Sequence, residues 1–77
     1  MDIDSLVQKA FHEVKKPFPG VRVLLGKNGT QFDLIVFESE VMALSGLQQE
    51  EFMAYLLDVK ARIEATGVVC GIVGEKK

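Results

Sequence analysis

Apolar residues recur at the helical period through the first part of the chain. They stand at positions i, i+3, i+4, i+7, i+8 and i+11, and they are Ile3, Leu6, Val7, Ala10, Phe11 and Val14. This spacing places them on one face of an amphipathic helix. Asp2 or Asp4 is suited to cap the first turn, and Pro17 stops the helix because proline lacks the N–H group. The pattern therefore predicts a helix over residues 3–16.

Two runs of strand-forming residues, 21–25 and 31–37, flank a turn signal at Asn28-Gly29. This dipeptide tolerates the positive φ angles of a type I′ hairpin turn. With it as the loop, Lys27 faces Thr30, and three apolar pairs follow: Leu25 with Phe32, Val23 with Leu34, and Val21 with Val36. Strand alternation puts these six apolar residues on one face. We therefore predict a hairpin over residues 21–37.

The other face of this hairpin mixes charged and apolar residues. In the predicted register Arg22 and Asp33 are diagonal neighbours, so we expect them to pair across the strands. The remaining residues of this face are Leu24, Ile35 and Phe37. An isolated two-layer domain would leave these three in water.

The second half of the chain begins with an ambiguous segment. Residues 38–46 fit either a short helix capped by Ser39 or a loop. A long helix is predicted over 49–65, followed by Gly67 as its stop. Its apolar stripe consists of Phe52, Leu56, Val59 and Ile63.

The last apolar segment, 68–73, is a continuous run rich in β-branched residues, which is typical of a strand buried on both sides. The element order is thus α-β-β-(α)-α-β. We predict an α+β fold, a two-layer sandwich in which both long helices cover one face of a three-stranded sheet. The last strand either pairs in parallel with 31–37 or in antiparallel fashion with 21–25.

Composition and charge narrow the class of protein. The chain has 77 residues, of which 48% are hydrophobic and 26% charged, with a net charge of −2. This balance predicts one small globular domain, 1–77, whose thin core favours association. A slightly acidic chain has no long-range attraction for nucleic acids. The single cysteine and the absence of a leader or an apolar run of about 18 residues predict a soluble, cytoplasmic protein without a membrane segment.

Candidate catalytic groups are few. His12 falls on the polar side of the first helix, and Cys70 lies within an apolar strand, where a thiol is inert. The acidic residues that could form a carboxylate pair or a cation site read better as solvated charges; they are Asp33, Glu38, Glu40, Glu50 and Glu51. We therefore expect no catalytic residue, no cofactor and no metal ligand.

Two features bear on nucleic-acid binding. The sequence Gly26-Lys27-Asn28-Gly29 has the G-x-x-G pattern with which KH domains clamp a nucleic-acid backbone, but here the pattern joins two strands instead of two helices. The element order is also that of the type II KH-like fold. The corresponding helix junction, 45–48, lacks a second glycine and any basic residue. A nucleic-acid-binding adaptor with KH-like topology is therefore an alternative reading, and nucleic acid is not the expected partner.

The apolar residues on the uncovered sheet face give the main functional prediction. Leu24, Ile35 and Phe37 would be joined there by Val69 and Val73, or else by the alternate set Val68, Cys70 and Ile72. We take the first set as the predicted self-association face. Such a patch is rarely left open in monomers.

We therefore predict a small noncatalytic protein-interaction module that forms a homodimer. The subunits would meet sheet against sheet or through strand edges, and a groove or outer helix surface would bind another protein. The alternatives are the nucleic-acid adaptor and a small enzyme or ligand carrier. The latter would have its site at the subunit interface, around Tyr55, His12 and a carboxylate.

Overall fold

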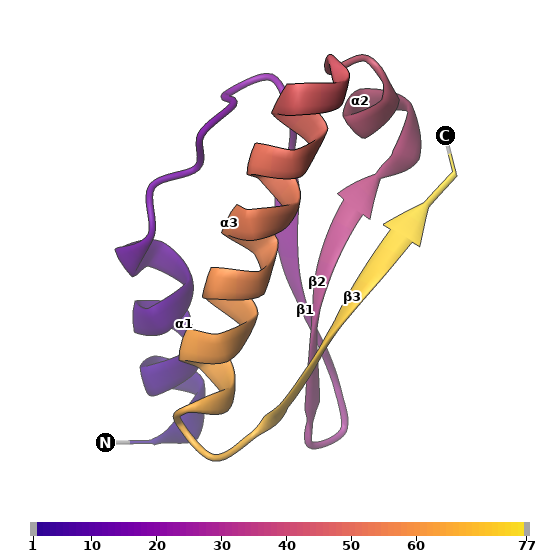
Figure 1. Cartoon of the computed structure of the whole chain (residues 1–77). Coiled ribbons are helices and arrows are strands. Elements are labelled where there is room, and N and C mark those ends of the chain that lie inside the picture. Colours follow the sequence, from indigo (N-terminus) through magenta and orange to yellow (C-terminus); the bar gives the residue numbers. More distant parts are fainter. Residues whose placement is uncertain (1, 77) are drawn as a thin grey trace.

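The computed structural model describes residues 2–76 and contains three helices and three strands (Figure 1). In chain order the elements are α1 (Ile3–Glu13), β1 (Val23–Asn28), β2 (Gln31–Phe37), α2 (Glu38–Met42), α3 (Gly46–Glu64) and β3 (Val69–Glu75). The predicted α+β class and element order are confirmed. None of the helices among the described residues combines the length and apolarity needed to cross a bilayer.

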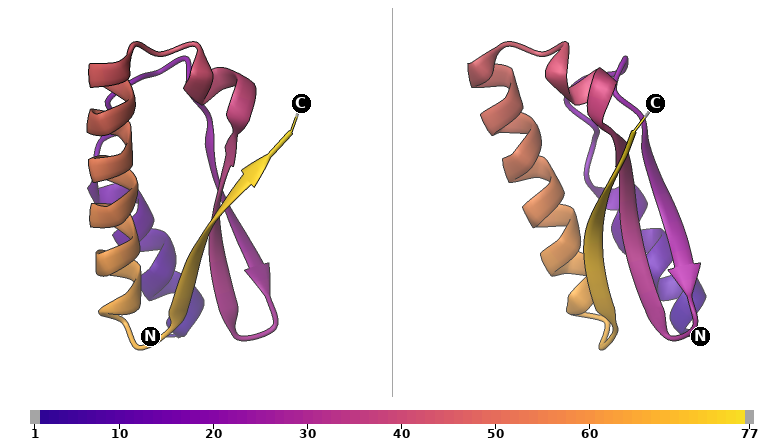
Figure 2. Two further views of the ribbon diagram at one scale, coloured as in Figure 1. Left: turned by 45° about the vertical axis from the view of Figure 1, so that its right-hand side comes forward. Right: turned by 90° about the vertical axis from the view of Figure 1, so that its right-hand side faces the viewer.

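The strands form one mixed sheet in the order β1-β2-β3. β1 pairs with β2 in antiparallel fashion, and β3 pairs with β2 in parallel. This resolves the two strand orders that the sequence left open. The left view of Figure 2 shows both long helices, α1 and α3, on one side of the sheet, as predicted.

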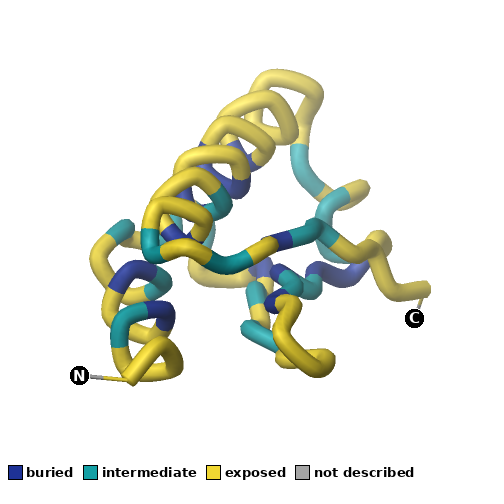
Figure 3. Tube along the Cα trace, turned by 90° about the horizontal axis from the view of Figure 1, so that it is seen from below, coloured by how far each residue is buried: buried dark blue, intermediate teal, exposed yellow. Residues whose placement is uncertain are grey.

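The core lies between this helix layer and the inner face of the sheet. Its largest fully buried side chains come from α1, α3 and β2, and they are Val7, Phe52, Leu56, Val59, Ile63 and Leu34. In Figure 3 the buried stretches of α1 and α3 turn toward the sheet, while their outer sides are exposed. The helical and strand periodicities thus converge on one shared interior.

The first helix ends at Glu13 and not at residue 16. Val14 already has an extended backbone (φ −98°, ψ 122°). Pro17 disfavours the helical conformation of the residue before it, so the chain leaves the helix ahead of the proline. Val14 nevertheless packs against the core from its extended position.

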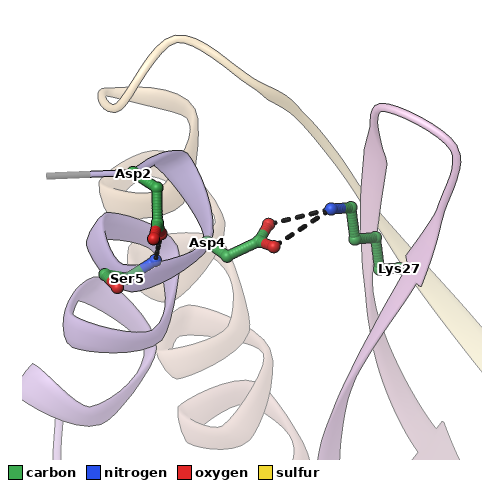
Figure 4. A network of polar contacts seen from close by, with 4 residues as sticks. All are labelled: Asp2, Asp4, Ser5 and Lys27. Atoms are coloured by element: carbon green, nitrogen blue, oxygen red, sulfur yellow. Dashed lines mark hydrogen bonds and ion pairs between the residues drawn. The ribbon is translucent and has the colours of Figure 1, made fainter.

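The start of α1 is fixed by two carboxylates that do different work (Figure 4). Asp2 caps the helix by accepting a hydrogen bond from the Ser5 N–H at 2.7 Å. Asp4 instead reaches the hairpin, where its Oδ1 accepts from the Lys27 ammonium at 2.9 Å. This ion pair joins the first helix to the end of β1.

The hairpin is present, but the predicted register is wrong by two residues. Val23 faces Val36 and Leu25 faces Leu34. The loop residues are Gly29 and Thr30, with a positive φ (64°) at Gly29 alone, as in a type II′ turn. A shift of two preserves the side-chain alternation, so the inner and outer faces are those predicted.

The segment 38–46 is mostly helical. α2 covers Glu38–Met42, and Ser45 then caps α3, which begins at Gly46 and not at residue 49. Ser45 Oγ accepts from the Gln48 N–H at 3.2 Å, while Gln48 Oε1 accepts from the Ser45 N–H at 3.0 Å. This reciprocal capping box sets the start of the helix.

The prediction that the last strand is buried on both sides is wrong. β3 is an edge strand, and Val69 is 63% exposed. Only the inner side of β3 faces the helices, where Cys70 is buried. Its apolar run does not distinguish a central strand from an edge strand with one uncovered face.

Candidate functional site

The outer sheet face, the side away from α1 and α3, carries residues from all three strands in transverse rows. Register places Leu24 opposite Ile35, and Ile35 opposite Val73. These three residues form a continuous apolar row across the sheet. Leu24 is 47% exposed and Val73 36%, because no described helix covers this face.

Next to the apolar row lies a second row, which contains a carboxylate and projects little from the sheet. It consists of Gly26, Asp33 and Gly71, which are paired across the sheet. Ile35 Cδ1 lies 2.9 Å from where a Cβ on Gly26 would be, and Asp33 Oδ1 lies 3.0 Å from the equivalent point on Gly71. The two glycines therefore leave room for neighbouring side chains to lie flat against the sheet.

Val69 is on the predicted face but apart from the apolar row. It is paired with Gln31, on the far side of the row that contains Asp33. The five predicted residues therefore do not form one contiguous patch. The part that does is the row of Leu24, Ile35 and Val73.

Phe37, the remaining predicted residue, is only 7% exposed. The Arg22 guanidinium lies 4.2 Å from the centroid of its ring. Arg22 is held there by Glu40, which accepts hydrogen bonds from both its backbone N–H and its Nε at 2.8 Å. The expected pairing of Arg22 with Asp33 is therefore wrong, because α2 brings a carboxylate to Arg22 that the strand pattern does not reveal.

On the helix side of the sheet, an apolar cavity of about 470 Å³ opens between α3, α2 and the ends of β2 and β3. We call it the α3–β3 groove. Its apolar walls are Val36, Val41, Phe52, Met53, Leu56 and Ile72. The only sequence signal for it is the excess of apolar residues on α3, where Met53 widens the stripe beyond what the core needs and is 48% exposed.

The groove is bordered by carboxylates. Glu50 lines it on the α3 side, and the Glu38 carboxylate lies at the β3 end, with Oε1 3.6 Å from where a Cβ on Gly74 would be. No lysine or arginine of residues 2–76 lines the cavity. Neither Glu38 nor Glu50 has an ion-pair partner among residues 2–76. The groove therefore offers an apolar interior and a negative border.

His12 and Tyr55 line a separate cavity of about 310 Å³ together with Lys15 and Lys16. The structure thus brings together two of the residues considered for an enzyme or carrier site. Burial raises the pKa of the Tyr55 hydroxyl above 10, its ordinary value. A carboxylate, the third expected member, is not among the lining residues of this cavity.

Cys70 and Asp33, two further candidates from the sequence, lie in surroundings that do not suit catalysis or metal binding. Cys70 is buried, and burial raises the pKa of its thiol, with Glu64 adding to the effect. Asp33 accepts a hydrogen bond from Gln31 Nε2 at 3.0 Å. Within residues 2–76, no group of three or more histidine, cysteine, aspartate or glutamate side chains is placed to hold a metal ion.

No protein-family model, curated protein or solved structure shows a significant match to this chain.

Proposed function

We propose that the protein is a small noncatalytic protein-interaction module that self-associates through its outer sheet face, most simply as a two-fold homodimer. The observation that carries this proposal is the apolar row of Leu24, Ile35 and Val73, which no described segment covers. Two such rows brought together around a two-fold axis would remove each other from water. The flat glycine-flanked row beside them suits sheet-on-sheet packing.

The expected strength of the contact is moderate. Burying about 400 Å² of apolar surface gains about 10 kcal/mol at ~25 cal/mol per Å². Loss of translational and rotational freedom costs roughly 4–15 kcal/mol, so only a small surplus is left. The surplus is at most about 6 kcal/mol, so we expect a dimer with a dissociation constant of tens of micromolar or higher.

Nucleic acid is disfavoured as the partner. The link between α2 and α3, residues 43–45, contains no basic residue, and the cavity next to it has Glu50 in its lining. Carboxylates at that place repel phosphates. A cytoplasmic location is part of the proposal, because Cys70 is the sole cysteine and suits a reducing compartment.

Sedimentation equilibrium at concentrations from tens to several hundred micromolar tests the self-association. We expect the wild type to approach the mass of two 8.5 kDa chains. Ile35→Arg and Leu24→Lys should sediment as single chains while keeping their helical circular dichroism. Leu24→Lys is the variant less prone to misfold, because Leu24 is half exposed.

Leu57→Arg is the matched control, since Leu57 is 54% exposed but lies on α3, away from the outer sheet face. It should remain dimeric. A wild type that stays at 8.5 kDa at several hundred micromolar would refute the proposed dimer.

A further inference from the structure

We infer that the α3–β3 groove binds an extended apolar peptide segment that carries lysine or arginine and adds as a strand to the free edge of β3. The groove is complete within one chain and lies on the opposite side of the sheet from the apolar row. This second surface therefore does not depend on self-association.

The edge of β3 supplies the backbone groups for such a strand. The Cys70 N–H is directed at the Glu64 carboxylate, where it helps to lower the pKa of that group. The Cys70 backbone thus faces away from β2, and strand alternation turns the Ile72 and Gly74 backbones to the same edge. The Cys70 N–H is thus already engaged by Glu64, but no described residue outside the sheet hydrogen-bonds to the backbone groups of Ile72 and Gly74. Strand addition would satisfy them.

The open part of the edge lies beside the cavity, since Ile72 and Gly74 also line the groove. A strand added there would direct alternate side chains toward the helix layer. The cavity of about 470 Å³ is large enough to take apolar side chains, and Met53 is exposed at its mouth. Backbone pairing and side-chain insertion are thereby available in one place.

Charge selects the kind of segment. Within residues 2–76, five other carboxylates are within 4 Å of a basic group, and they are Asp4, Glu13, Glu40, Asp58 and Glu64. Glu50 and Glu38, at the two sides of the groove, are not so paired. A lysine or arginine of the bound segment would complement them, whereas acidic or phosphorylated segments and nucleic acids would be repelled.

The probe is a fluorescein-labelled peptide as long as β3. The peptide has alternating valine and threonine residues, a central leucine and a lysine at each end. Fluorescence anisotropy should show saturable binding to the full chain. We expect binding at least about tenfold weaker when the end lysines are replaced by glutamates. Methylating alternate backbone nitrogens of the peptide should reduce binding by a similar factor, because strand pairing needs the N–H groups.

Two substitutions at one position test the edge. Gly74→Pro removes the outward N–H and should weaken peptide binding at least tenfold. Gly74→Ala keeps this N–H, and its Cβ would lie at an ordinary contact distance of 3.5 Å from Glu38 Cγ. It should weaken binding much less than Gly74→Pro does, and both variants should keep the wild-type circular dichroism.

Paired substitutions on α3 test the groove and its charge. Met53→Asp and Glu50→Lys should weaken binding, because Met53 and Glu50 line the groove. Leu57→Asp and Glu51→Lys make the same changes at exposed positions of α3 outside it and should leave binding unchanged. Ile35→Arg should bind the peptide normally, which separates this site from the self-association face.

Three results would overturn the inference. The first is a lysine-ended peptide that does not bind or binds no better than the glutamate-ended one. The second is equal binding by Gly74→Pro and Gly74→Ala. The third is loss of the wild-type dimer in Gly74→Pro alone, which would assign the β3 edge to a second copy of this chain.

Discussion

At the scale of single residues, stability depends on side chains that have no exposed surface. Ile63 lies near the end of α3 and is fully buried. Ile63→Val removes one methylene, so we expect the free energy of unfolding to fall by about 1 kcal/mol. Urea denaturation followed by circular dichroism measures it. Leu57→Val, on the exposed side of the same helix, should change it by less than about 0.5 kcal/mol; equal losses would contradict the assigned core.

Glu40 gives a prediction on pH. Hydrogen bonding from the Arg22 backbone N–H, more than the side chain, holds the pKa of Glu40 below its ordinary value of 4.5. Because the folded pKa is depressed, the stabilisation is complete above pH 4.5 and is lost as the pH falls through the lower folded value. The pKa values of Asp2 and Glu64 are lowered too, by hydrogen bonds from Ser5 and Lys60, so they act in the same direction.

We therefore expect the urea midpoint of unfolding to decrease as the pH is lowered from about 5 to about 3. Glu40→Gln should lower the midpoint at neutral pH and make this decrease smaller. Glu51→Gln changes an exposed carboxylate that has no ion-pair partner in the described structure, and it should retain the full decrease. A Glu40→Gln profile parallel to that of the wild type would speak against the Arg22 contact.

At the scale of elements, the start of α3 depends on one serine. Ser45→Ala removes the hydrogen bond that the Ser45 hydroxyl accepts in the reciprocal cap. We expect a loss of about 1 kcal/mol in the free energy of unfolding. Ser39→Ala is the comparison, because Ser39 lies inside α2 and its hydroxyl makes no hydrogen bond in the described structure. Urea denaturation of the two variants should rank Ser45→Ala as clearly less stable. The reverse ranking would place the functional cap elsewhere.

Periodicity predicts the elements and their faces better than it predicts their pairing. A strand alternates every two residues, so Leu25 can face Phe32 or Leu34 with the same face buried. The choice is made by the turn, where Gly29 alone takes a positive φ and Thr30 completes the loop. The helix start at Gly46 was likewise missed, because Ser45 follows a short apolar stretch that fits a helix end as well as a helix cap.

At the scale of the whole molecule, the fold keeps the only thiol out of reach. Cys70 is 2% exposed, and its pKa is raised chiefly by burial. We expect its reaction with a thiol reagent at pH 8 to be at least about a hundredfold slower in the native protein than in urea, because the thiolate forms only when β3 opens. Reaction at the unfolded rate under native conditions would show that β3 is not closed over the core.

The candidate surfaces differ in how far the sequence predicts them. The outer sheet face follows from alternation along each strand, so Leu24 and Ile35 could be assigned to it before the strand order was known. The α3–β3 groove could not be predicted from the sequence, because it depends on the parallel pairing of β3 with β2. This pairing brings Ile72 opposite Leu34 and near α3. The position of Arg22 over the Phe37 ring also depends on α2, because Glu40 of α2 holds Arg22 there. The sequence did not decide whether this segment is a helix or a loop.

The parallel pairing of β2 and β3 has a consequence for synthesis on the ribosome. Every residue of β2 meets a partner that is made much later, after both α2 and α3, as Gln31 with Val69. The emerging chain can close the hairpin early, but Leu34 and Phe32 must wait for the final strand and the long helix before they are shielded. The nascent protein therefore carries the apolar face of β2 uncovered until β3 has been made, which is the period when a chaperone would matter most.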